Sequence, residues 1–329
     1  MYLIFMRARG ISYDTGFFDH GFSTHEPWDP EVVARELRVI RDDLHCNAVR
    51  LIGSSPDRLM TAASLAADLG LEVWLCPWTS DFTQSELHSL LVDLAARAEP
   101  LRARTEVVMV LGAELCLLTS GFLPGDTIHE RIEGLSAHRA ELPKLPTKIN
   151  AFLGRAVAAV REVFDGKVTY ASIPFEGVDW TPFDIVGVDA HRTAEVADIY
   201  PEAIRKLVAQ GKPVAITEFG CATFKGAGAM GARAAMIVEY DGYRPARLKG
   251  QYERDEQEQA EQLRELIGIY EDTGVDAAFV FTFANFPLTG PLDLASYGVV
   301  EAREDRTWTP KAAFAAVAES YAKSRRRLD

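Results

Sequence analysis

Short apolar runs, each bounded by turn residues, recur along this chain and are typical of buried parallel strands. They cover residues 7–13, 47–53, 72–78, 106–115, 168–175, 184–191, 213–220 and 277–285. Most segments between them carry apolar residues at helical spacing, as Val33, Leu37, Ile40 and Leu44 do, so amphipathic helices are expected there. Strands that mostly alternate with helices predict an α/β fold, a single (β/α)8 TIM barrel.

Capping residues mark where several of these helices begin. Asp29-Pro30 and Ser55-Pro56 each place an N-cap before a proline, and Thr83 and Glu86 form a capping box. Thr309-Pro310 is expected to open the last helix. The link over 176–180 is short, so the sixth strand is expected to follow the fifth directly.

The whole chain, residues 1–329, is expected to form one barrel domain, because no linker or break in composition divides it. Long loops are expected after the fourth strand (116–145) and after the seventh (222–252). The second is long enough to be a lid or a wall that faces a substrate. An open doubly wound sheet is the rival fold, but no GxGxxG or Walker A pattern follows a predicted strand to cradle its usual ligands.

Charge and cysteine usage narrow the class of protein. The net charge of −13 argues against a nucleic-acid partner and makes polyanionic substrates less expected. No run approaches the roughly 18–20 apolar residues of a membrane span, and Met1–Met6 lacks the basic leader of a signal peptide. Cys46, Cys76, Cys116 and Cys221 show no CxxC spacing, which favours free thiols. We expect a cytoplasmic protein without a metal, another cofactor or a membrane partner, and the oligomeric state stays open.

Two of the apolar runs carry a glutamate at their end, Glu114 and Glu218. An ionised Glu in apolar surroundings must be paired, neutralised or used, and barrels keep their chemistry at the C-terminal ends of strands. Counting by twos along each strand lets both carboxylates point into the barrel mouth. A separation of about 5–5.5 Å would suit retaining glycoside hydrolysis, and about 6.5–9.5 Å would suit inversion.

Further residues near strand ends are candidates to contact a substrate, and each also has a structural reading. An arginine can form an ion pair with a carboxylate, and an Asp and a His lie on one face of the sixth strand. A third Glu stands at a turn. Aromatic rings near strand ends can stack on a sugar or pack against the protein. These candidates are Arg50, Asp189, His191, Glu176, Trp78, Trp180, Tyr13 and Asn285.

A distinctive set of residues stands at these strand ends and near the C-terminus: Glu114, Ile216–Gly220, Arg50, Tyr297–Val300 and Trp308–Phe314. In this set the chain resembles the large clan of (β/α)8-barrel glycoside hydrolases. The resemblance implies that Glu114 is the general acid/base, Glu218 the nucleophile, and Arg50 the partner that keeps Glu218 ionised. The chain is also similar to bacterial barrel proteins loosely labelled abortive-infection proteins, a label that implies no chemistry.

Two positions depart from that clan. Its members usually have Asn immediately before the strand-four Glu, where it binds the sugar 2-hydroxyl, and this chain has Ala113. They often have Trp at the end of strand eight as a sugar platform, where Phe283, Ala284 and Asn285 are expected here. Both departures weaken sugar recognition and leave the carboxylate pair intact.

The resemblance therefore implies a retaining glycosidase whose partner is a carbohydrate, a glycoside or a glycosylated small molecule. One alternative is a non-hydrolytic barrel enzyme of the isomerase or lyase type, with Glu114 or Glu218 as general base. Another is a non-catalytic ligand-binding or defence protein on the same fold.

Overall fold

The structure, a computed structural model, describes residues 6–19 and 21–326. Most of Met1–Met6, the segment expected to lack a signal-peptide leader, therefore lies outside the described residues. No helix in the described ranges is both long and apolar enough to cross a membrane.

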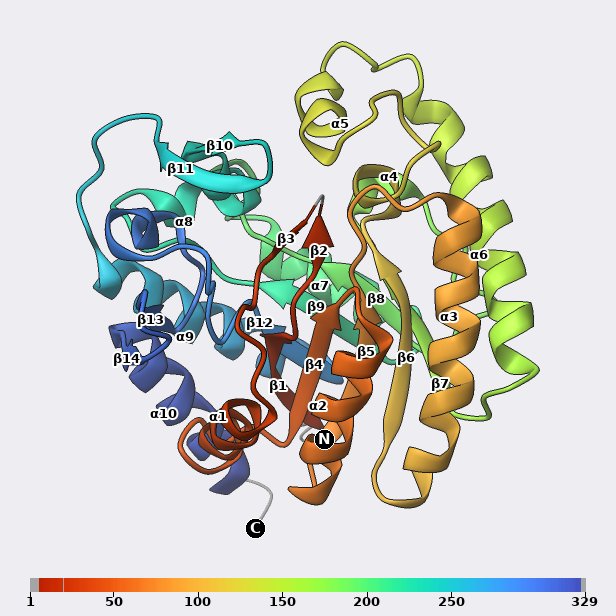
Figure 1. The fold of residues 1–329 in the computed structure, drawn as a ribbon, viewed down its shortest axis with the longest axis horizontal. Helices are drawn as coiled ribbons and strands as arrows, with labels where there is room; N and C mark the ends of the chain where they lie inside the picture. Colours follow the sequence, from red (N-terminus) through yellow and green to blue (C-terminus); the bar gives the residue numbers. More distant parts are fainter. Residues whose placement is uncertain (1–5, 20, 327–329) are drawn as a thin grey trace.

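Eight parallel strands form the barrel, in the order β7-β6-β5-β4-β1-β12-β9-β8 (Figure 1). Their bounds are Ala8–Asp14 (β1), Ala48–Gly53 (β4), Glu72–Pro77 (β5), Val107–Ala113 (β6), Lys167–Ala171 (β7), Val186–Asp189 (β8), Val214–Phe219 (β9) and Ala277–Val280 (β12). A parallel bridge between Ser172 and Val188 joins the two ends of the sheet, supported by the hydrogen bond from Asp189 N to Ser172 O (2.8 Å). The predicted (β/α)8 barrel is confirmed.

Helices surround the strands: α1 (Pro30–Asp42), α2 (Pro56–Asp68), α3 (Gln84–Ala98), α6 (Leu145–Arg161), α7 (Tyr200–Val208), α9 (Glu256–Thr273) and α10 (Ala312–Arg326) (Figure 1). Short 3₁₀ segments add η1 (Glu99–Ala103), η3 (Pro174–Glu176), η4 (Ala194–Val196) and η6 (Gly290–Ala295). The caps at Asp29, Ser55 and Thr83 are confirmed by hydrogen bonds from the first turns of α1, α2 and α3. Between β7 and β8, where every residue is described, η3 is the only helical segment, as the short link predicted.

The expected start of the last helix is wrong. Thr309 and Pro310 lie in β14 (Trp308–Pro310), which pairs antiparallel with β13 (Val300–Ala302). The residue before a proline is biased towards extended backbone, and pairing with β13 uses that conformation, so the helix begins only at Ala312.

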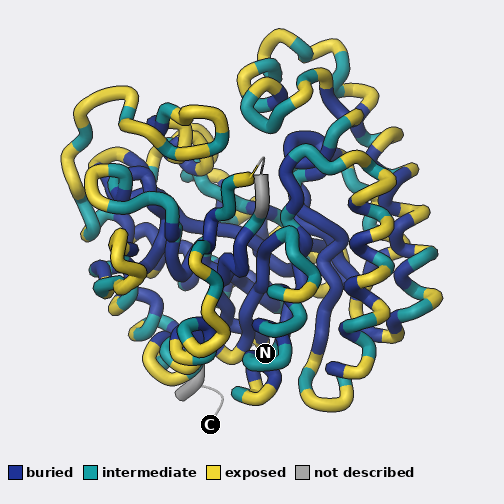
Figure 2. Tube along the Cα trace, in the orientation of Figure 1, coloured by how far each residue is buried: buried dark blue, intermediate teal, exposed yellow. Residues whose placement is uncertain are grey.

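Apolar side chains fill most of the barrel interior. Trp74 and Phe279 are fully buried there, with ring centroids 4.8 Å apart, together with Val108 and Val110. A Cβ at Gly10 would lie 2.3 Å from the Phe279 ring, so only glycine fits at that point of β1. Figure 2 shows the strands as a continuous buried layer. With the interior filled, polar chemistry is left to the carboxyl ends of the strands.

Several chain excursions stand above those carboxyl ends (Figure 1). After β1 comes the small hairpin β2 (Phe18–Asp19) and β3 (Phe22–Ser23). The long loop after β6 contains α4 (Leu115–Leu118), α5 (Ile128–Gly134) and η2 (Leu142–Lys144). The long loop after β9 contains α8 (Ala227–Met230), η5 (Gly231–Ile237) and the hairpin β10 (Val238–Asp241) and β11 (Arg244–Leu248).

Candidate functional site

Glu218 is held from two sides near the end of β9. Arg50 Nη1 lies 2.7 Å from its Oε1, and His191 Nε2 lies 3.6 Å from its Oε2. Glu218 is only 5% exposed. Burial on its own raises the pKa of Glu218, but the charge of Arg50 and the nearby His191 ring bring that pKa below its ordinary value. The carboxylate is therefore held ionised in a fixed orientation.

Arg50 reaches this position from β4 through the barrel interior, where its side chain is fully buried. Its guanidinium also donates to Ser12 Oγ (3.4 Å), Thr217 O (3.4 Å) and Cys76 Sγ (3.2 Å). Burial lowers the pKa of Arg50, but the neighbouring Cys76 and Glu218 outweigh it and the net shift is upward. The arginine thus stays charged.

Glu114 follows β6 and has a left-handed backbone, φ 41° and ψ 47°. That conformation costs a non-glycine residue roughly 1–2 kcal/mol, and such strain is often kept at functional sites. Its amide donates to Ala171 O (2.9 Å), and its carbonyl accepts from Leu117 N and Leu118 N as α4 begins. Because the backbone leaves the extended conformation at Glu114, its side chain does not continue the alternation of directions along β6.

The Glu114 carboxyl group is partly buried and accepts no hydrogen bond within the described part of the chain. Burial first, and then the charges of Glu218 and Glu176, raise the pKa of Glu114 to about 8, against the lowering effect of Arg50. The two carboxyl groups therefore have opposite ionisation tendencies: Glu218 is anionic near neutral pH and Glu114 holds a proton.

Glu176 does not line the mouth, so the expectation that it contacts a substrate is wrong. It is fully buried, and its carboxylate accepts from Cys116 N (3.0 Å) and Tyr170 Oη (2.7 Å). Tyr170 Oη in turn accepts from Leu115 N (2.7 Å). These hydrogen bonds satisfy the amides of the two residues that follow Glu114. Glu176 therefore holds the turn that carries Glu114.

Asp189 and His191 both lie against Glu218. Asp189 is buried, with Oδ1 accepting from Thr217 Oγ1 (2.6 Å), while Oδ2 finds no partner among the described residues. Burial and then the Glu218 charge raise the pKa of Asp189 well above its usual range. The His191 ring contacts Gly220 O through Nδ1 (3.0 Å); burial lowers its pKa, but Glu218 reverses this and the net shift is upward.

Aromatic rings form an apolar wall at the mouth. Trp78, just after β5, is partly exposed, with its ring 5.7 Å from that of Phe281. The Phe281 ring also contacts those of His191 (6.0 Å) and Tyr297 (6.0 Å). Sequence reasoning missed Phe281 because it extended the eighth strand to residue 285, whereas β12 ends at Val280. Its spacing of two from the inward-pointing Phe279 was the available signal.

That shorter strand also corrects the expectation for residues 283–285. Phe283 is fully buried and Ala284 is 1% exposed, so both pack inside the protein beyond the end of β12. Asn285 uses Oδ1 to accept from Tyr297 N (2.8 Å), which orders the loop that carries Tyr297.

Tyr13 and Trp180 also lie away from the mouth. Tyr13 is fully buried and donates its hydroxyl to Glu36 on α1. Trp180 packs against Phe183, and its carbonyl accepts from Lys212 Nζ (2.7 Å), just before β9 begins and therefore at the opposite end of the barrel. Both residues are near strand ends in the sequence, but their side chains point away from the mouth, and the sequence pattern does not give that direction.

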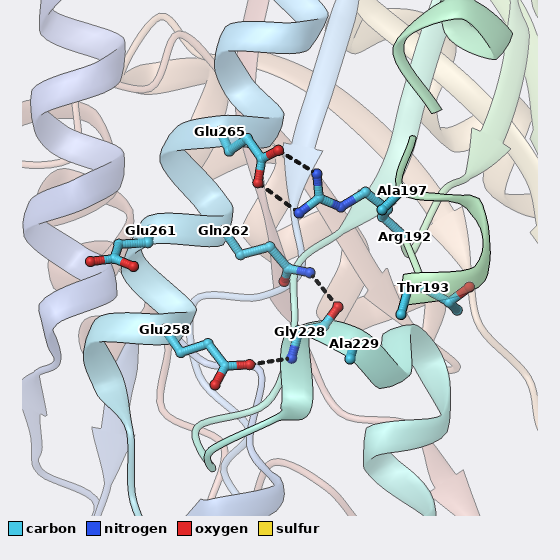
Figure 3. A pocket seen from close by; sticks show the side chains of 10 residues that line it. Arg192, Thr193, Ala197, Gly228, Ala229, Glu258, Glu261, Gln262 and Glu265 are labelled. Carbon is cyan, nitrogen blue, oxygen red and sulfur yellow. Dashed lines mark hydrogen bonds and ion pairs between the residues drawn. The ribbon is translucent and has the colours of Figure 1, made fainter. Parts of the chain in front are cut away.

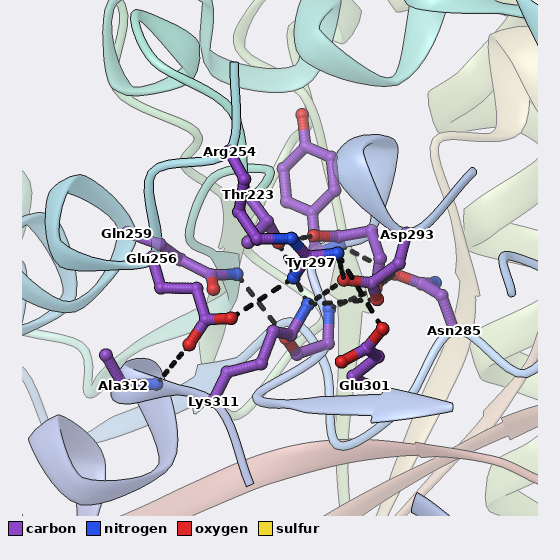
Figure 4. Close-up of polar contacts among 12 residues, drawn as sticks. Thr223, Arg254, Glu256, Gln259, Asn285, Asp293, Tyr297, Glu301, Lys311 and Ala312 are labelled. Atoms are coloured by element: carbon purple, nitrogen blue, oxygen red, sulfur yellow. Dashed lines mark hydrogen bonds and ion pairs between the residues drawn. The ribbon is translucent and has the colours of Figure 1, made fainter. Parts of the chain in front are cut away.

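A buried polar network braces the segment that follows Glu218 (Figure 4). Lys311 Nζ, 3% exposed as a residue, donates to Thr223 Oγ1 (2.9 Å) and pairs with the fully buried Asp293 (3.2 Å). Arg254 binds the other Asp293 oxygen (2.9 Å), and Gln259 Nε2 donates to Cys221 O (2.9 Å). The network ties the C-terminal region to the chain just beyond β9.

A cavity of about 300 Å³ lies elsewhere, between α9 and the loops after β8 and β9 (Figure 3). Arg192 pairs with both oxygens of Glu265 (2.6 and 2.7 Å). Glu258 accepts from Gly226 N and Gly228 N (2.7 and 2.9 Å). Neither Glu114 nor Glu218 lines this cavity, so we place the candidate site at the barrel mouth, where the unusual ionisation is found.

Comparison with solved structures gives glycosidases as fold neighbours. A GH113 β-1,4-mannanase has a TM-score of 0.63 and 15% identity, with 97% of this chain and 99% of that chain covered. A Parabacteroides merdae β-glucuronidase has the same score and identity, with 96% of this chain but only 36% of that chain covered. A putative β-galactosidase from Bacteroides fragilis has a TM-score of 0.58 at 15% identity, with 96% and 42% covered.

No family model matches the sequence, and no curated protein matches it either. What these comparisons show is a fold: the chain has the (β/α)8 barrel that these glycoside hydrolases share.

Proposed function

We propose that this protein is a retaining glycoside hydrolase in which Glu218 is the nucleophile and Glu114 the general acid/base. The observation that supports the proposal is the opposite ionisation of the two groups at one barrel mouth. Glu218 is paired with Arg50 and His191 and has a lowered pKa, whereas the pKa of Glu114 is raised to about 8. A displacement at an acetal carbon needs such a pair, one anion and one proton donor.

In the first step the ionised Glu218 attacks the anomeric carbon and forms a glycosyl ester. The bond from that carbon to the glycosidic oxygen breaks, and the Glu114 proton passes to this oxygen so that the aglycone leaves as a neutral alcohol. Arg50 holds Glu218 on a rigid strand, in the fixed geometry that attack requires.

In the second step Glu114, now ionised, takes a proton from water. The water oxygen attacks the anomeric carbon, the ester bond to Glu218 breaks, and Glu218 returns to its anionic state beside Arg50. The sugar leaves with its original anomeric configuration, and Glu114 is again protonated.

For the substrate we propose a glycoside or a glycosylated small molecule. Trp78 and Phe281 offer apolar ring surface for the face of a sugar or an aromatic aglycone. Ala113 has no side-chain donor for a sugar hydroxyl. The neighbours named as mannanase, glucuronidase and galactosidase support a glycoside and leave the sugar open.

A mechanism-based label tests the assignment of roles. An activated fluorosugar is incubated with the protein, which is then digested and analysed by mass spectrometry. We expect the label on Glu218, and we expect Glu114→Ala to regain rate with added azide. A label on Glu114 would reverse the two roles.

A second candidate function is a non-hydrolytic proton transfer. The Glu114 carboxyl group has a raised pKa and accepts no hydrogen bond from the residues that the structure describes. Together with Ala113 this favours the second candidate, because a base poised near neutral pH suits isomerisation or elimination. No label and no turnover across a broad glycoside panel would support this candidate over hydrolysis.

A further inference from the structure

The hairpin β10–β11 reaches across the barrel mouth. It belongs to the loop after β9, yet Tyr243 donates its hydroxyl to Asp81 Oδ2 (3.1 Å) in the loop after β5. Around the ring, β5 is four strands from β9 in either direction, so the two strands lie diametrically opposite. The contact between their loops therefore joins opposite sides of the mouth.

Two further contacts fix the hairpin, one to the loop after β6 and one to the loop after β1. The Tyr240 ring lies 4.8 Å from the ring of His129 on α5, which belongs to the loop after β6. Arg244 stacks over the ring of Phe22 in the loop after β1, 5.0 Å from its centroid. Loops from three other strands thus receive the hairpin, and Figure 1 shows it with α5 above the strand ends.

The receiving side is held by buried polar contacts. The Asp81 side chain is 10% exposed and forms an ion pair with Arg131, whose own side chain is fully buried. Arg131 also donates to Leu117 O (2.6 Å) and Gly125 O (3.0 Å), so it joins the loop after β6 to Asp81. Tyr243 therefore binds a carboxylate that is already fixed in place.

The supporting side is anchored as well, by apolar packing and backbone hydrogen bonds. Val238 and Leu248, at the base of the hairpin, pack in an apolar cluster with Phe224 and Tyr297. The loop closes at its neck through Lys225 N to Glu253 O (2.9 Å) and Asp255 N to Thr223 O (2.9 Å). The hairpin is a supported arm, and we call residues 238–248 the roof.

We infer that the roof restricts the site to small glycosides and to the ends of glycan chains. The inference rests on the proposed function for its substrate class. A polysaccharide that is cut at an internal bond must lie across an open groove with chain on both sides. A roof fixed to opposite rims blocks that approach, so a chain can enter only by an end.

Accessibility of the site tests the roof without knowledge of the sugar. Glu114→Cys places a thiol at the site of a chain whose four native cysteines are all buried. The variant is treated with a small reagent, N-ethylmaleimide, and with a large one, dextran carrying maleimides along its chain. Glu304→Cys, in the exposed turn between β13 and β14, is the matched control. We expect the dextran reagent to be disfavoured at position 114, relative to the control, by at least about tenfold, equivalent to about 1.4 kcal/mol.

Shortening the roof should remove this discrimination. In one variant Asn-Gly replaces residues 240–246, which keeps the pairs Val238–Leu248 and Glu239–Arg247 and deletes the three contacts. Tyr240→Ala combined with Tyr243→Phe is a milder variant, should the first fail to fold. Equal reagent preference at positions 114 and 304 in the unmodified roof would overturn the inference.

Product analysis tests the substrate class. A panel of 4-methylumbelliferyl monoglycosides is tested first. For each sugar that the protein hydrolyses, oligosaccharides of the same sugar are then tested and their products identified. We expect products released only from a chain end, and internal cleavage once the roof is shortened. Internal cleavage by the intact protein would overturn the inference, while absence of any turnover would count against the proposed function and leave the thiol result to decide about the roof.

Discussion

Arg50 and Glu218 form a buried ion pair across the barrel interior, with 2.7 Å between Nη1 and Oε1. Their strands, β4 and β9, are not neighbours in the sheet, so the pair joins two separate parts of the wall. One arginine thereby supports the barrel and sets the charge of the proposed nucleophile.

We predict that Arg50→Met lowers the free energy of unfolding by about 3–5 kcal/mol, because it leaves a buried carboxylate without its cation. Urea denaturation measures the change. Adding Glu218→Gln to the same chain should recover part of the loss, since no unpaired charge then remains. If the double variant is less stable than Arg50→Met by the full amount of Glu218→Gln alone, the two residues are not coupled.

The second prediction concerns the pH dependence of activity. With the pKa of Glu114 raised to about 8, the proton donor is present below that pH and is lost above it. The rate kcat/KM should therefore fall as the pH rises through about 8, and the acid limb should report Glu218 below its ordinary pKa. Glu114→Gln should abolish the basic limb that the unmodified protein shows with the same glycoside. A basic limb that stays in place would contradict the assignment of Glu114.

The third prediction concerns stability and pH at the same residue. A group whose folded pKa is raised binds a proton more tightly in the folded state, so its stabilising contribution is present at low pH and is lost as pH rises through the folded pKa. Glu114→Gln should thus be more stable than the unmodified protein at pH 9 and should show little gain at pH 5. Thermal unfolding at both values checks this. An equal change at the two values would mean that Glu114 carries no shifted proton.

The fourth prediction concerns Glu176, which holds the turn after Glu114. Glu176→Gln should lower kcat by about 10²-fold, the typical effect of a catalytic group displaced by about 1 Å, with little change in KM. The loss should shrink for a dinitrophenyl glycoside, whose leaving group needs no proton from Glu114. Tyr170→Phe, which removes the hydroxyl between Glu176 and Leu115, is the matched variant and should show the same dependence on leaving group. Equal losses for good and poor leaving groups would point to a general structural defect.

Local sequence determined the elements of the barrel. Apolar runs bounded by turn residues predicted the strands because a strand buried on both faces has few polar positions. The caps at Asp29, Ser55 and Thr83 gave helix starts because an N-cap satisfies amides only a few residues away. The same local pattern placed Glu114 and Glu218 near strand ends, since a charged residue that closes an apolar run marks where the buried strand stops.

Only the tertiary structure decided what those residues face. Glu176 and Trp180 stand near strand ends in the sequence, but one carboxylate turns inward to bind backbone amides and the other side chain lies at the opposite end of the barrel. The apolar run continues beyond Val280, but the strand pairing of β12 stops there. Phe281 therefore lies beyond the strand, in the wall of the mouth. Pairing, burial and side-chain direction depend on segments that fold against each other from far along the chain, as Tyr243 and Asp81 do across 162 residues, and no local pattern encodes them.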